Sequence, residues 1–411
     1  MKYVWLSLGC LCCLQAQAEE FSFDFSEYQR PPWELNGYVQ ASVQQLDLNA
    51  DSALNQLSPD SDFTRYLAET ELSGVYRWDQ VSLQGLAKWQ GQTDRYQTQD
   101  QADIYELYVH YQPSPNWQWE LGKRSLKWGK GYAFNPVAVF ERTKDALDPE
   151  LAREGFVMGR VDWVKDFAEL GSLSFTTALL PVSDSLNQDF GETEELNVAA
   201  KLSWVVGRSD IDLIWRNQAS QPAAYGLSLS HSLAVNFAIH AEFLWAKRTR
   251  WLLDENAQLV TEAVEGANAL VGLRYLTNQE TTWIAELYHQ SAGYDVDEMH
   301  GLYHYAPQVN RAILQSQLEN TQYLSAQAMQ NYASIKVTQK EPWNWLYWSL
   351  GLGAIVNLDD ASSIVTPEVI YTGLSNLEWR LRANIFNGAN QTEYAERQYA
   401  TRTELQMRWY F

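Results

Sequence analysis

The sequence predicts an all-β protein, a transmembrane antiparallel β-barrel of about eighteen strands. Segments in which apolar and polar residues alternate with period two recur from residue 33 to the C-terminus, as in strands with one face toward an apolar medium. The connections between them are alternately short and long. The chain also holds 18 Trp and 23 Tyr, residues that gather at membrane–water boundaries. Because backbone amides cannot stay unpaired in lipid, a membrane protein without spanning helices must close into a barrel.

The first eighteen residues have the pattern of a secretory signal peptide. Lys2 precedes an apolar stretch from Tyr3 to Leu14, and an A-x-A site at 16–18 precedes two glutamates. The apolar stretch is shorter than the ~20 residues that a spanning helix needs. All three cysteines lie inside this segment, so the exported chain has no thiol for a disulfide or a metal site. We expect cleavage after Ala18, a short periplasmic segment over 19–32 and a single barrel over 33–411.

Eighteen segments carry the alternating pattern. "LEWRLRANI" is a clear case, with Trp379 and Leu381 on one face and Arg380 and Arg382 on the other. The predicted strands are 33–46, 65–77, 80–92, 102–113, 116–128, 153–164, 168–180, 193–206, 209–218, 222–231, 234–247, 266–276, 279–290, 328–338, 345–357, 362–372, 375–386 and 399–411.

The connections support this assignment independently. Every second connection is a short turn, as expected of a barrel whose N-terminus and C-terminus are both periplasmic. The short ones include 113–116, 165–167, 206–209, 277–279 and 373–376, and the long ones 47–64, 129–152, 181–192, 248–265, 291–327 and 387–398. Two places weaken the strand count. Pro367 lies inside a strand, where it predicts a bulge, and 65–77 places Glu69 and Glu71 opposite a moderately apolar face. Sixteen strands are therefore the alternative.

The last segment, "TRTELQMRWYF", alternates strictly up to the terminal phenylalanine. Leu405, Met407, Trp409 and Phe411 share one face, opposite Glu404, Gln406, Arg408 and Tyr410. The segment resembles the C-terminal aromatic signature by which outer-membrane barrels are recognised for assembly. We expect it to be the closing strand, with Trp409, Tyr410 and Phe411 as the assembly signal. That resemblance implies the barrel-assembly machinery as a partner, outer-membrane lipid and lipopolysaccharide as surroundings, and localisation in the outer membrane of a Gram-negative cell.

The face opposite the lipid should line the lumen. Its charges are nearly balanced in sign, as expected where many of them pair across strands, and a one-signed lining for a polyanion is not predicted. Lining residues that we single out are Glu120, Arg124, Arg160, Asp162, Arg380, Arg382 and Arg408.

The stretch 121–156 is the most distinctive. Gly122-Lys123-Arg124, Trp128-Gly129-Lys130-Gly131 and Asn135-Pro136 resemble a run common in Gram-negative porin-like families of uncharacterised cargo. The resemblance covers under a tenth of the chain. It implies a porin-like channel whose third extracellular loop, 129–152, folds inward.

The composition of this loop is compatible with a pore constriction. Val137, Val139 and Phe140 form an apolar patch that needs a dry surface, and the nearest is the inner wall near the fifth and sixth strands. Docked there, the loop would hold Arg142, Lys144, Asp145, Asp148 and Glu150 in the lumen. The alternative is that these charges simply solvate a surface loop. With the balanced wall, we expect weak ion selectivity.

Other chemistries have little support. A net charge of −21 argues against nucleic acid, and no G-x-S-x-G, H-E-x-x-H or phosphate-cradling motif appears, so we predict no enzyme and no cofactor. Asp295, Asp297, Glu298, His300 and His304 form the single weak candidate for a metal site, with two histidines at i, i+4 spacing.

Two functions therefore compete. One is passive diffusion of small hydrophilic solutes, because barrels of about 16–18 strands leave an aqueous lumen. The other is a receptor or adhesin whose extracellular loops bind a partner. Neither the solute nor the oligomeric state follows from the sequence.

Overall fold

The computed structural model describes residues 31–59, 61–254, 258–319 and 321–411. The chain divides into two units, 1–32 and Trp33–Phe411. The predicted signal peptide lies outside the described residues, as does the following segment apart from Pro31 and Pro32. The second unit is described here by itself.

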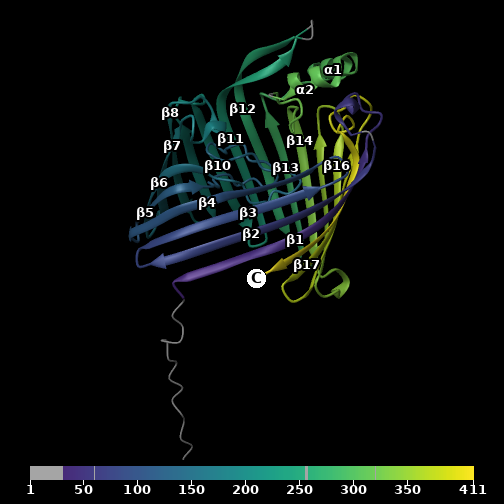
Figure 1. The fold of residues 1–411 in the computed structure, drawn as a ribbon. Helices are drawn as coiled ribbons and strands as arrows, with labels where there is room; N and C mark the ends of the chain where they lie inside the picture. The colour runs from purple at the N-terminus through teal and green to yellow at the C-terminus, as the bar shows by residue number, and fades with distance from the viewer. Residues whose placement is uncertain (1–30, 60, 255–257, 320) are drawn as a thin grey trace, which may run out of the picture. The chain divides into compact units, whose positions relative to one another are not determined.

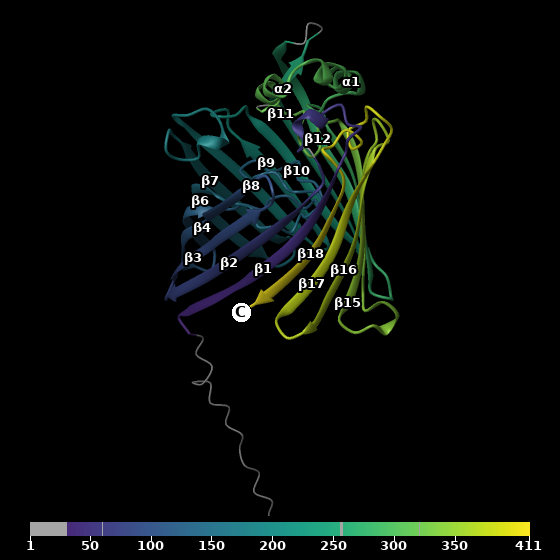
Figure 2. The ribbon, with the colours of Figure 1, turned by 45° about the vertical axis from the view of Figure 1, so that its right-hand side comes forward.

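Trp33–Phe411 forms a closed barrel of eighteen antiparallel strands (Figures 1 and 2). Each strand pairs with its neighbours in sequence, and β1 pairs with both β2 and β18, so the sheet has no free edge. The predicted eighteen strands are confirmed, and the alternative of sixteen is wrong. The strands are β1 (Trp33–Leu48), β2 (Phe63–Trp78), β3 (Val81–Thr93), β4 (Thr98–Ser114), β5 (Trp117–Arg124), β6 (Phe156–Phe167), β7 (Gly171–Val182), β8 (Glu195–Val206), β9 (Ser209–Arg216), β10 (Ala224–Ala234), β11 (Phe237–Leu253), β12 (Leu259–Leu276), β13 (Thr281–Gln290), β14 (Asn331–Lys340), β15 (Trp348–Asn357), β16 (Ser363–Leu374), β17 (Leu377–Asn387) and β18 (Tyr399–Tyr410).

The connections keep the predicted parity only in part. Those after even-numbered strands are short as predicted, but 94–97 after β3 is short too, and the predicted long connection 248–265 is mostly taken up by β11 and β12. Of the turns after even-numbered strands, 341–347 is the longest. The long connections after odd-numbered strands include 125–155 and 291–330. The short turns lie at the end of the barrel where the chain terminates, which we call the turn end, and the long connections lie at the other, the loop end (Figure 1).

Side chains alternate between the two faces of the wall. On β17, Leu381 is 48% exposed on the outer face, whereas the neighbouring Arg382 is 8% exposed on the inner face. Trp119, Phe243 and Leu405 are likewise exposed on the outer face of their strands. An apolar outside and a polar inside are what a transmembrane barrel requires.

The predicted bulge at Pro367 is wrong. Pro367 lies opposite Leu352 in an unbroken register with β15. The pairing with β17 continues from Val365 to Glu368 without a shift, and the irregularity of this pair comes later, between Tyr371 and Leu374. Pro367 has no N–H to donate. The strand therefore leaves Thr366 and Pro367 unpaired with β17 and keeps the same register on both sides of them.

Two apolar clusters fill parts of the barrel. One lies under the connection 125–155. The other forms a cap at the loop end, where helices α1 (Val296–Tyr305) and α2 (Arg311–Leu318) pack with Leu54 and Tyr394 from two other connections. None of the helices in the described part of the chain is both long and apolar enough to span a bilayer.

Candidate pore constriction

The connection 125–155 between β5 and β6, which we call the inner loop, folds into the barrel. Its apolar residues Leu126, Trp128, Val137, Val139 and Phe140 are all buried, Val137 completely (0% exposed). They pack on an apolar patch of an otherwise polar inner wall. That patch comprises Phe156 and Met158 of β6, Ala178, Leu180 and Val182 of β7, Ala199 of β8, Ile214 of β9, Ala224 of β10, and Leu244 and Ala246 of β11.

This docking surface differs from the expected one. The sequence placed the apolar patch of the loop near the fifth and sixth strands, but the wall patch extends across β6 to β11. Period-two reading of the single strands does reveal inward apolar residues at Leu180, Ile214 and Leu244. Their gathering into one surface depends on the register between strands, which the sequence alone does not supply.

Polar contacts also fix the inner loop to the wall. Lys130 forms ion pairs with Asp210 and Asp212 of β9, at 3.1 and 3.0 Å. The Arg216 guanidinium donates a hydrogen bond of 3.1 Å to the backbone oxygen of Val139. The loop is therefore held at several points along β9 to β11.

Glu141 organises the inside of the loop. Its carboxylate accepts hydrogen bonds from the Trp128 N–H (2.6 Å) and the Asn135 amide (2.8 Å), and pairs with Arg153 at 3.0 Å. Burial raises the pKa of Glu141 above its usual range, although these donors act in the opposite direction. Sequence reasoning missed Glu141 and Arg153, because nothing in their spacing shows that they meet.

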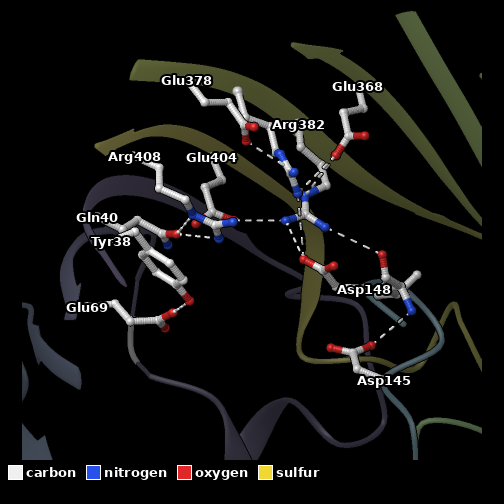
Figure 3. A network of polar contacts seen from close by, with 12 residues as sticks. Tyr38, Gln40, Glu69, Asp145, Asp148, Glu368, Glu378, Arg382, Glu404 and Arg408 are labelled. Atoms are coloured by element: carbon white, nitrogen blue, oxygen red, sulfur yellow. Dashed lines mark hydrogen bonds and ion pairs between the residues drawn. The ribbon is translucent and has the colours of Figure 1, made fainter. Parts of the chain in front are cut away.

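The far part of the inner loop reaches β17. Asp148 forms an ion pair of 2.9 Å with Arg382, and Arg380 lies 3.9 Å from the same carboxylate (Figure 3). Glu368 and Glu404 lie 3.8 and 4.0 Å from Arg382. Since the loop starts at β5 and contacts β9 to β11 on the way, it crosses the lumen.

The five residues predicted to form the constriction take different positions. Asp148 contacts the opposite wall, and Glu150 lines the adjacent cavity. Arg142 pairs with Glu154 and Asp189, beside β6. The ammonium of Lys144 donates to the backbone oxygen of Gly131, and the Asp145 carboxylate accepts from the Leu147 N–H at 2.9 Å. Thus Lys144, Asp148 and Glu150 line the cavity beside the loop, whereas Arg142 and Asp145 do not.

Cavities lie beside the inner loop. The first cavity, of 660 Å³, lies between the inner loop and the wall of β12 to β17. On the loop side it is lined by residues from 130–133 and 144–150. A second, of 550 Å³, lies between the loop and the connection 291–330, and a third, of 300 Å³, lies against β4 to β8. Among the described residues, Arg274 and Lys336 in the first cavity form no ion pair, and neither do Lys127 and Lys201 in the third. Glu150 in the first cavity and Glu106 in the third likewise form no ion pair within the described part of the chain, so the cavities carry unpaired charges of both signs.

Solved structures with this architecture exist. OccK5 (OpdH) of Pseudomonas aeruginosa is 11% identical, with a TM-score of 0.55 over 92% of this chain and 98% of its own. OccK8 (OprE) of the same organism is 9% identical, with the same coverage and TM-score. OccAB1 of Acinetobacter baumannii is 8% identical, with a TM-score of 0.56 over 92% of this chain and 96% of its own. These neighbours are outer-membrane porins. This chain has the porin fold. No protein-family model matches it, and no curated protein matches its sequence.

In this porin fold the predicted lining residues form two networks. On β5 and β6, Arg160 pairs with Glu120 at 3.2 Å and with Asp162 at 2.8 Å, and Arg124 also pairs with Glu120. On β17, Arg380 and Arg382 share Asp148 and Glu368 as acidic partners. Arg408 on β18 donates to the Gln40 side chain at 2.6 Å and lies over the Tyr38 ring, at 4.2 Å from its centroid (Figure 3).

The acidic residues of the candidate metal site make contacts that stabilise α1. Asp295 caps α1 by accepting from the Glu298 N–H at 2.9 Å, and Glu298 pairs with Arg250. His300 and His304 are exposed on the same helix. In the described part of the chain, His, Cys, Asp and Glu side chains form no group of three or more that could hold a metal ion.

The predicted assembly signal lies where the porin barrel closes. The backbones of Phe411 and Gly37 exchange hydrogen bonds of 3.0 and 3.1 Å. Trp409 and Phe411 are exposed on the outer face, and Tyr410 lies on the face of Arg408.

Proposed function

We propose that the protein is an outer-membrane channel through which small hydrophilic solutes diffuse passively. In this proposal the signal peptide directs export and is cleaved after Ala18, and the barrel-assembly machinery inserts the chain through Trp409–Phe411. The turn end then faces the periplasm and the loop end the outside, in a membrane of lipid and lipopolysaccharide.

The observation that carries the proposal is the inner loop, which crosses the lumen and pairs with the far wall through Asp148 and Arg382. An ordered crosspiece inside a wide barrel restricts the cross-section without closing it, since cavities remain beside it. The cavities carry unpaired charges of both signs, so we expect weak ion selectivity superimposed on passive diffusion.

Deleting residues 132–148 tests this proposal. The deletion removes the part of the loop that crosses the lumen and leaves the strands intact. Single-channel conductance in planar bilayers should rise, and the deletion variant should still migrate as a folded, heat-modifiable barrel. Unchanged conductance in a folded variant would refute the constriction, and a wild-type protein that conducts no ions would refute the channel.

The second candidate function is a receptor or adhesin. The observation in its favour is the cap at the loop end, where Leu302, Leu314 and Tyr394 are completely buried and give the outer surface a defined shape. A defined shape is useful for binding a partner, whereas passive diffusion does not need one.

A further inference from the structure

Two carboxylates of the inner wall bind consecutive backbone amides of the inner loop. Glu242 on β11 accepts hydrogen bonds from the N–H groups of Lys130 and Gly131, the latter at 2.8 Å. Glu286 on β13 accepts from the next three residues, Tyr132 (2.5 Å), Ala133 (2.8 Å) and Phe134 (3.4 Å). Every N–H from 130 to 134 is therefore directed at one of the two carboxylates. A backbone amide is an obligatory donor, so a loop in the lumen needs such acceptors.

These carboxylates are buried and have few other partners. Glu242 is 3% exposed and Glu286 is 2% exposed. Among the described residues, neither forms an ion pair with an arginine or a lysine, unlike Glu120 or Glu368 on the same wall. In the described part of the chain, Glu286 has one ionisable hydrogen-bond partner, His240, whose Nε2 lies 2.8 Å from it. Burial of a carboxylate is costly without donors, and here the loop provides them.

The wall is shaped for this contact. Gly272 of β12 lies between β11 and β13, where a Cβ atom would be 2.3 Å from His240 Nε2 and 2.8 Å from Glu286 Cγ. Any larger residue would displace the His240–Glu286 pair from its position facing the loop. The Tyr132 ring also contacts His240 edge to face, with centroids 5.4 Å apart.

We propose that Glu242 and Glu286 are positioning residues that latch the inner loop and thereby set the conductance of the channel. This proposal deepens the proposed function and rests on it. The latch holds 130–134, while the apolar patch at Val137, Val139 and Phe140 holds the following turn. Without the latch, the apolar patch, the Lys130 ion pairs and the Asp148–Arg382 pair still hold the loop, but less tightly. The loop entry then moves in the lumen, and Val137 leaves the wall more often.

Glutamine at these positions is the informative change. It has the size of glutamate but presents one acceptor and one NH₂ donor, so part of its amide would face a backbone N–H instead of accepting from it. We expect E242Q and E286Q each to raise the mean conductance and to increase the open-channel current noise several-fold, with the largest effect in the double variant. E393Q is the matched control, since Glu393 is a similarly buried carboxylate (2% exposed) that accepts from the Ala328 N–H and the Tyr332 hydroxyl and from none of these amides.

A chemical readout of loop docking does not depend on conductance. From residue 19 onward the chain has no cysteine, so V137C places a single thiol beneath the loop in the exported chain. In purified, heat-modifiable protein, a maleimide should label V137C slowly, and much faster when E242Q and E286Q are combined with it. Equal labelling rates, together with wild-type conductance and noise in the folded single and double variants, would overturn the latch. If wild-type protein conducts nothing but labelling still responds to the latch variants, the latch stands as a loop anchor and the proposed channel fails.

Discussion

At the scale of single residues, barrel closure depends on the contact between Gly37 and Phe411. A Cβ atom on Gly37 would lie 2.8 Å from the Phe411 ring and 2.4 Å from the backbone oxygen of Glu71. Only glycine leaves enough space for the terminal ring and for close approach of β1 and β2. The aromatic terminus thus has a structural partner in addition to its predicted role in assembly.

We predict that Gly37→Val impairs folding of the barrel. The valine side chain cannot fit without moving the Phe411 ring or separating β1 from β2, so less protein should migrate as the heat-modifiable folded form. Gly74→Val is the matched control, because a Cβ atom there has its nearest neighbour at an ordinary 3.5 Å. Equal yields of folded protein for both variants would show that the space at Gly37 is not needed.

At the scale of a single element, β17 shows how one strand serves two media. Trp379, Leu381 and Ile385 are exposed on the outer face, and Arg380 and Arg382 point into the lumen. The sequence predicts this division through strict alternation. Alternation does not predict that Arg382 pairs with Asp148, because the two residues are far apart in the chain.

Substitutions on β17 should therefore have unequal effects. Leu381→Arg places a cation against lipid, which costs roughly 2–4 kcal/mol near the bilayer midplane. Arg382→Leu removes the ion pair with Asp148 but leaves the lipid face unchanged, so it should disturb the inner loop more than the barrel. Urea unfolding of the protein in liposomes measures both. Equal loss of stability would mean that the assigned faces are wrong.

At the scale of the whole molecule, the cap and the barrel are separately stabilised. The barrel is held by the continuous strand ladder. The cap is held by apolar contacts among α1, α2 and the connections around Leu54 and Tyr394, which pack on wall residues such as Tyr332 and Ile364. A residue buried in the cap should therefore affect the loop end without unfolding the strands.

We predict that Leu314→Asp disorders the cap while the barrel remains heat-modifiable. Leu314 is completely buried, and an unpaired carboxylate there is strongly unfavourable. Limited proteolysis should cut within 291–330 in this variant. Ile313→Asp, on the exposed side of the same helix at 45% exposure, should leave this region resistant. Resistance in both variants would contradict a cap held by its apolar core.

The sequence by itself indicated eighteen strands, with sixteen as the alternative, and determined the short turns after even-numbered strands and the face of each strand. These properties are local, because period two is written into each segment and turn residues lie between segments. The apolar patch of the inner loop could also be predicted, since apolar residues in a polar connection need a dry surface.

Only the tertiary structure decided where that loop docks, which of its charges face the passage and which wall carboxylates bind its amides. Glu242 and Glu286 look like any other inward glutamates in the sequence. Their role appears only when strand register places them side by side, and the burial of a carboxylate depends on the donors that the fold brings to it.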